Sequence, residues 1–510
     1  MKFLKTFCSL RTLGIACSVG VALMVPAVSV LLAADLPTVP GEVTFSKDIA
    51  PILQRSCQNC HQPNSVAPMS LITYQQARPW AKSIKERTLI RDRRGVMPPW
   101  YIEKTIGIQH YKNDPSLSDL ELAKIAKWAD TGAKEGDPKD LPPPVPLIDG
   151  TKWTLGEPDL IVSTPEVTVK AGVPDWWGEL APAPTGLTED RWVKSVEMRE
   201  VNDIPPDTGG GRATVGARYV FHHMIWTTTV PDRQAALGED VGEGSGTWPI
   251  HEVGRNADIF PDDAGKLLRA GSSLVFSSTH IHSNGRDTKA RLVFGFKFFP
   301  KGYKPTVRYA RRGLGNGVDI DIKADDPSQR LDAYNVLSEN TKITSYEPHL
   351  HAPGVRMCLE AIWGINVQTL SCAGYDHNWV RVYEYDDDYA PLLPKGTILH
   401  IIGYMDNSVA NKNVPDPRNW SGSGNRSISN MFIDLGQGVA LTDEQFYAEM
   451  ARRREKLKLT PEDVVIGCPL CNGDPIPPTQ RRPRATPTAA PPGAVNPAAA
   501  NQPNQGPVNQ

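Results

Sequence analysis

The sequence lacks a second long hydrophobic run, a block of basic residues and an unpaired cysteine. After the N-terminal apolar run no segment is long enough to span a membrane, so we expect no further span. A formal net charge of −2 without a basic block gives no electrostatic basis for nucleic acid or an anionic membrane as a partner. Two of the eight cysteines, Cys8 and Cys17, lie within residues 1–34. The other six form three pairs along the chain: Cys57 and Cys60, Cys358 and Cys372, and Cys468 and Cys471.

Residues 1–34 have the layout of a secretory signal peptide. Basic residues precede an apolar run that ends in small residues, which predicts cleavage near Ala34 and a periplasmic or secreted mature protein. An uncleaved N-terminal anchor is the alternative, because the run is long for a signal and Pro26 interrupts it only in part. Paired cysteines agree with export, since disulfides persist in oxidising compartments.

Composition divides the rest of the chain into parts. A length of 510 residues, 40% of them hydrophobic, predicts two to four domains with ordinary cores. We expect a multidomain fold in which a small all-α domain precedes two all-β, jelly-roll-like sandwiches, because short alternating strands begin after Trp153. The expected parts are the signal (1–34), a helical domain (43–136), a Pro-rich linker (137–150), a first sandwich (151–312), an inter-domain segment (313–340), a second sandwich (341–455), a CxxC-containing extension (456–474) and a disordered tail (475–510).

The stretch SCQNCHQ contains a CxxCH motif. Cys57 and Cys60 can form thioethers with haem vinyl groups, while His61 supplies an imidazole to the iron. Met97, in GVMPPWY, is the expected sixth ligand, because two prolines would hold its thioether in a fixed loop. A disulfide between the two cysteines is the alternative. Helix, CxxCH, Met loop and a closing helix together resemble a small class I cytochrome c domain, which implies one covalently bound haem c.

Six of the eleven histidines stand in three pairs. The pairs are His222 with His223, His280 with His282, and His349 with His351. An HxH on a strand places both imidazoles on one face, spaced to chelate one ion, whereas HH needs a strand end or a twist. Surface or core histidines would account for one isolated pair, but three pairs favour metal binding. Neutral imidazoles without a cysteine or carboxylate cluster suit copper or zinc, and a methionine sulfur among them favours copper.

The order of these motifs is HH, a His before a short NG turn, HxH, and then a Met in NRSISNMFIDLGQ. This order resembles the copper type II, ascorbate-dependent monooxygenases, which include peptidylglycine alpha-hydroxylating and dopamine beta-monooxygenases. The likeness covers roughly residues 153–450 and, with the CxxCH module, is to a bacterial form with a fused cytochrome c domain. It implies two β-sandwich domains that hold one copper ion each. The implied electron-transfer site is His222, His223 and His280, and the implied oxygen-binding, catalytic site is His349, His351 and Met431.

Several side chains compete for these roles. His282 is either an outer neighbour of the first site or a competitor of His280 for the metal. Met405, in GYMDNS, is a rival sulfur that spacing alone does not separate from Met431. The remaining histidines have no partner at ligand spacing and are expected to be structural: His110, His251, His377 and His400.

The later cysteines predict two disulfides. Cys358 and Cys372 flank a turn at residues 364–366, so they fall opposite each other across a hairpin and can form a bridge. GCPLCN lacks a following histidine and is therefore no haem site. A small loop disulfide between Cys468 and Cys471 is expected, with a metal clip as the alternative.

The activity that the resemblance implies is copper-dependent monooxygenation, in which O2 is used to hydroxylate a C–H bond of a small organic substrate. The implied cofactors are two copper ions and one haem c. We expect the fused haem to receive electrons from an external donor and to feed them to the copper ions in place of ascorbate. A non-catalytic exported electron-transfer or copper-binding protein is the alternative, and a β-sandwich binding module is a third hypothesis.

Overall fold

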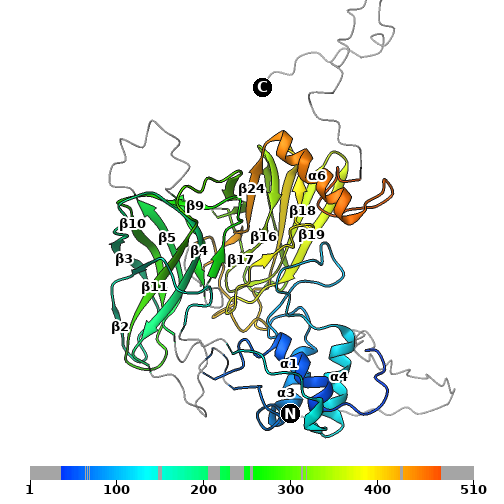
Figure 1. The fold of residues 1–510 in the computed structure, drawn as a ribbon. Helices are drawn as coiled ribbons and strands as arrows, with labels where there is room; N and C mark the ends of the chain where they lie inside the picture. Colours follow the sequence, from blue (N-terminus) through cyan, green and yellow to red (C-terminus); the bar gives the residue numbers. More distant parts are fainter. Residues whose placement is uncertain are drawn as a thin grey trace, which may run out of the picture.

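The computed structural model describes residues 36–63, 65, 67, 69–147, 152–204, 219–229, 246–252, 257–311, 314–317, 319–424 and 429–472. The predicted signal peptide and tail lie outside these ranges. Within them the chain is mainly antiparallel β-sheet with few helices, and the N-terminal helices lie below two groups of strands (Figure 1). None of the helices in the described ranges is long and apolar enough to cross a membrane.

A helical unit opens the described chain. It consists of η1 (Phe45–Ile49), α1 (Ala50–Ser56), α2 (Tyr74–Ala77), η2 (Arg78–Trp80), α3 (Ala81–Thr88), α4 (Asp119–Asp130) and η3 (Pro138–Asp140). The predicted closing helix is α4. It begins with a capping box, because Ser118 Oγ accepts a hydrogen bond from the Glu121 N–H and the Glu121 carboxylate accepts one from the Ser118 N–H. The buried core of this unit is formed by Phe45, Ile49, Leu53, Ile125 and Trp128.

The first β unit has two sheets. The larger sheet consists of β1 (Leu160–Ser163), β2 (Val167–Val169), β4 (Arg191–Asn202), β8 (Ala257–Ile259), β9 (Lys266–Leu268) and β11 (Thr288–Phe298). The smaller consists of β3 (Trp176–Pro184), β5 (Phe221–Thr229), β6 (Gly246–Thr247), β7 (His251–Glu252) and β10 (Ser273–Ile281). Met198 and Phe294 of the larger sheet share one buried core with Trp226 and Phe276 of the smaller, as in a β-sandwich.

The second β unit lies beside the first (Figure 1). Its sheets are β12 (Arg308–Arg311), β15 (Asn340–Ile343), β21 (Leu392–Leu393) and β24 (Gln437–Leu441); β13 (Leu314–Asn316), β17 (Pro348–Leu350) and β23 (Phe432–Asp434); β14 (Gln329–Val336), β18 (Gly354–Trp363), β19 (Asn366–Gly374) and β22 (Ile398–Met405); and β16 (Ser345–Tyr346) with β20 (Tyr383–Glu384). Leu359, Ile401 and Phe432, each 0% exposed, lie in its core.

Residues 313–340, expected as an irregular inter-domain segment, instead contribute to the second β unit. Strands β13 and β14 lie within this range, and Leu314, Ile320 and Ile322 are buried in the second core. The sequence did not predict β14 because Ala333 is its one buried residue. The strand therefore lacks the alternation of apolar and polar residues that identifies a half-buried strand.

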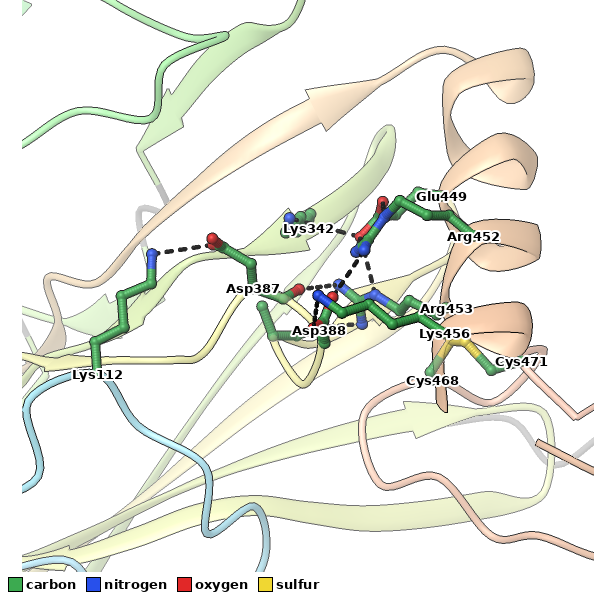
Figure 2. Close-up of polar contacts among 11 residues, drawn as sticks. Lys112, Lys342, Asp387, Asp388, Glu449, Arg452, Arg453, Lys456, Cys468 and Cys471 are labelled. Carbon is green, nitrogen blue, oxygen red and sulfur yellow. Dashed lines mark hydrogen bonds and ion pairs between the residues drawn. A yellow bond between two sulfur atoms is a disulfide. The ribbon is translucent and has the colours of Figure 1, made fainter. Parts of the chain in front are cut away.

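Both predicted disulfides are present. Cys358 of β18 lies directly opposite Cys372 of β19 in the strand register, with the two Cα atoms 4.1 Å apart. Cys468 and Cys471 close the predicted short loop as a disulfide rather than as a metal clip. Their sulfur atoms lie against the last helix of the structure (Figure 2).

That helix is α6 (Asp443–Leu457), which lies against the second β unit (Figure 1). Its central carboxylate, Glu449, contacts Arg452 at 2.6 Å and Arg453 at 2.9 Å within the helix. Glu449 also lies 3.6 Å from the ammonium of Lys342 on β15 (Figure 2). Arg453 is 1% exposed, and its buried positive charge is compensated by the carboxylate of Glu449.

Residues 100–111, here called the strap, leave the helical unit and pack against β19. Ile102 forms a β-bridge with Ala373, and the Ile108 N–H donates a 2.8 Å hydrogen bond to the Leu370 carbonyl. The strap therefore ties the helical unit to the second β unit by its own backbone. Strap residues buried in the second core are Trp100, Tyr101, Ile102, Ile108 and Tyr111.

Gly374 generates the first prediction, because it lies where β19 meets the helical unit. A Cβ at this position would lie 2.2 Å from the Asp92 carbonyl oxygen, so Gly374→Ala must displace the backbone there. We expect this variant to lose about 1–3 kcal/mol of stability, measured by thermal unfolding followed by circular dichroism. Gly317→Ala is the matched control, since a Cβ there meets no atom within 4 Å. Equal unfolding temperatures for the two variants would contradict the close contact.

Candidate metal centre

A β-bulge brings the adjacent His222 and His223 into one site. In the register of β5 and β10, His280 is opposite His223 while Ile281 is opposite Phe221, so His222 is an extra residue in β5. Such a bulge re-aims a side chain that regular alternation would send to the other face. Ligand atoms of the three histidines lie within 4.8 Å of one another. The structure thus gathers the first predicted ligand set.

His280 is held by two neighbours. Its Nε2 lies 2.9 Å from a carboxylate oxygen of Asp175, and its ring stacks on Trp177 with centroids 4.3 Å apart. Its Nδ1 is buried and has no hydrogen-bond partner in the part of the chain that the structure describes. A carboxylate on one ring nitrogen fixes the tautomer and orients the other nitrogen toward a metal, which suits a copper or zinc ligand.

Burial keeps these imidazoles neutral. It lowers the pKa of His222 and His223 well below the usual range, and the neighbouring imidazoles lower both further. Burial also lowers the pKa of His280, although the contact with Asp175 opposes this. Neutral imidazole is the form that binds a metal ion, so the protonation states fit the ligand set.

His282 is the outer residue of its pair. Its Nε2 lies 3.0 Å from the Tyr219 carbonyl oxygen, and its ring centroid is 5.5 Å from that of His222. His282 is not part of the group formed by His222, His223 and His280, whose ligand atoms lie within 4.8 Å of one another. This geometry favours His282 as a neighbour of the first site rather than as a competitor of His280.

The second predicted set begins on β17, which carries His349 and ends one residue before His351; both imidazoles are buried, with centroids 5.4 Å apart. Nδ1 of His351 lies 3.0 Å from the Ser429 carbonyl oxygen. Nδ1 of His349 lies 2.8 Å from a carboxylate oxygen of Glu252, which belongs to β7 of the first β unit. Because these contacts hold Nδ1 of both rings, a metal would bind at Nε2.

The register of β17 and β23 favours Met431 over Met405 as the sulfur ligand. His349 is opposite Ile433 and Leu350 is opposite Phe432, so one further step along the two chains reaches His351 and Met431. Met405 is instead 0% exposed on β22 and belongs to the core of the second unit.

Two histidines of each group line one small pocket. Its walls therefore come from both β units. The lining residues are His222, His223, Glu252, His349, His351, His377 and Val380. Glu252 and His377 were not anticipated as site residues, because neither stands in a motif and each reaches the pocket only through the tertiary fold.

His377, which the sequence predicted to be structural, lines this pocket. Burial, and next the His349 imidazole, lower its pKa to about 4, so the ring is neutral. The other three histidines expected to be structural are not among the residues that line this pocket. His400 lies between carboxylates of Glu360 and Asp332 at 2.9 and 2.8 Å. His110 stacks on Tyr389 with centroids 3.5 Å apart, and His251 is 5% exposed.

The CxxCH residues follow α1 directly. Cys57 and Cys60 are not joined by a disulfide, which is the state that thioether formation requires. Nδ1 of His61 lies 3.0 Å from the Met69 carbonyl oxygen, so an iron would bind at Nε2. Met97 is 41% exposed on the turn before the strap, and its role as sixth ligand stays a prediction.

Metal content is the second prediction. The protein should bind two copper ions, with type 2 spectra because no thiolate accompanies the histidines. His280→Ala should release one copper and leave the second, as measured by elemental analysis after dialysis against a chelator. His110→Ala, remote from the pocket ligands, should retain both. Retention of both ions in His280→Ala, or zinc in the sites under copper-replete conditions, would contradict the assignment.

No protein-family model and no curated protein match this sequence. Among solved structures, the chain is similar to the cowpea mosaic virus top component, with a TM-score of 0.26 and 9% identity over 58% of this chain and 95% of that chain. It is also similar to infectious bursal disease virus Gx strain (TM-score 0.14, 10% identity, 57% and 72% covered) and coconut allergen cocosin (0.09, 8%, 49% and 86%). At these TM-scores the similarities identify neither a fold family nor a function.

Proposed function

We propose that the protein is an exported, haem- and copper-containing monooxygenase that uses O2 to hydroxylate a C–H bond of a small organic substrate. The observation that carries the proposal is the convergence of two histidine groups, with no cysteine among the lining residues, on one pocket. The motif order of the copper type II, ascorbate-dependent monooxygenases supplies the reaction class. The two disulfides agree with a location in the periplasm or outside the cell.

The chain's own residues prepare two copper sites in this proposal. One is His222, His223 and His280, and the other is His349, His351 and Met431. Copper bound at the second would supply the one-electron chemistry that activates O2 for hydroxylation. Asp175 and Glu252 orient one imidazole in each set, and burial of the rings keeps bulk water from the pocket.

The helical unit would act as a cytochrome c domain. Cys57, Cys60 and His61 would hold the haem, with Met97 as the sixth ligand. The strap would keep this domain against the β unit that carries the HxH motif. Electrons from an external donor would enter at the haem and pass to the copper ions.

A non-catalytic electron-transfer protein is the second candidate. One observation favours it: among the described residues that line the pocket, Val380 is the single apolar side chain. Substrate pockets usually present more hydrophobic wall than this. Substrate-dependent consumption of O2 therefore distinguishes the monooxygenase from the electron-transfer protein.

The third prediction concerns turnover. The reduced, copper-loaded protein should consume O2 in a manner that depends on an organic substrate, measured with an oxygen electrode across a panel of neutral lipids, aromatics and amines. Met431→Ala should abolish this consumption, whereas Met405→Leu should preserve it because Met405 lies in the core. Rapid reoxidation that is indifferent to every substrate and to Met431 would favour the electron carrier.

The fourth prediction concerns haem. In a host that matures c-type haem, the wild-type protein should carry one covalent haem, seen by the pyridine haemochrome assay. Met97→Ala should lose the charge-transfer band of methionine-ligated ferric haem. Met69→Leu should retain the band, because Met69 contacts His61 through its backbone carbonyl. The reverse pattern would show that Met69 is the ligand.

A further inference from the structure

His377 lies between the two histidine groups. Its ring centroid is 5.7 Å from that of His222 and 5.9 Å from that of His351. The segment that carries it is anchored beside the HxH motif, because the Tyr375 hydroxyl donates a 2.5 Å hydrogen bond to the Leu350 carbonyl. The backbone next to His351 therefore fixes the start of the segment that delivers His377.

A turn fixes the rest of this segment. The Asp376 carboxylate accepts a 3.0 Å hydrogen bond from the Asn378 N–H, and the Asp376 carbonyl accepts one of the same length from the Trp379 N–H. Val380 then returns to the interior at 6% exposure and lines the pocket. His377 is thus held toward the pocket from both sides.

Among the described residues, two buried polar atoms of this pocket have no hydrogen-bond partner. One is Nδ1 of His377, and the other is Oε2 of Glu252, whose Oε1 contacts His349. Glu252 is 3% exposed, and burying a carboxylate costs free energy unless donors or a cation compensate its charge. A metal ion in the pocket would bind the imidazole and balance the carboxylate at the same time.

The second centre has the smaller set of imidazoles. Three imidazoles already gather at the first centre, whereas the HxH motif supplies two, with Met431 as the predicted sulfur. A third imidazole would raise the second set to four ligands, a number that copper accepts readily. His377 lines the same pocket as both HxH imidazoles and is the unassigned histidine there.

We propose that His377 is a ligand of the metal ion held by His349 and His351, and that Glu252 balances the charge of that ion through His349. The assignment rests on the two copper sites of the proposed function and adds a residue to the second. It makes the second centre a site of three imidazoles and one thioether.

The test uses copper(II) itself as the probe and equilibrium binding as the readout. In a His280→Ala background, which disables the first centre, His377→Ala should weaken copper(II) binding about ten-fold or more in competition with a chelator. Pulsed electron paramagnetic resonance should count one fewer bound imidazole. His110→Ala in the same background is the matched control, because that ring stacks on Tyr389 and does not line the pocket.

A rescue experiment guards against a folding defect. In His377→Gly, free imidazole should restore copper affinity if the lost group is a ligand, whereas a packing role would show no rescue. Unchanged affinity and imidazole count in His377→Ala, or failure of the rescue, would overturn the assignment alone. A wild-type protein that binds no copper would overturn both the assignment and the proposed function.

Discussion

The contact between the Glu252 carboxylate and the His349 imidazole joins the two β units where their histidines meet. Both partners are buried, so replacing His349 by an apolar residue would remove this contact from the Glu252 carboxylate in the interior. Glu252 belongs to β7 and His349 to β17, and one pocket exists only while these strands stay together. The pocket is lined by residues of both β units, so it depends on the contact between β7 and β17 and not on one sequence motif.

In each histidine set a carboxylate contacts one imidazole, but it contacts a different ring nitrogen in the two sets. Asp175 contacts Nε2 of His280, whereas Glu252 contacts Nδ1 of His349. The two carboxylates thus orient one ring in each set in opposite senses. In each set, therefore, the protein fold itself fixes the orientation of one imidazole.

Sequence patterns predicted what depends on local spacing. The HxH spacing, the hairpin disulfide and the closing helix α4 each need only strand or helix periodicity, so the sequence alone predicted them. The sequence did not predict three other features. These are the strands within residues 313–340, the bulge at His222, and the positions of Glu252 and His377 in the pocket. Each of these depends on long-range register or on contacts between distant strands, which leave no periodic signal in the sequence.

The strap has a consequence for the order in which the chain is assembled. Trp100 and Tyr111 are buried among residues that follow them by more than two hundred positions, such as Leu359 and Ile401. A chain made from its N-terminus must therefore hold these aromatic rings in solvent, or on a chaperone, until β18 and β22 exist. The core of the helical unit, by contrast, draws only on residues up to Ala133, so it can form before β18 and β22 exist.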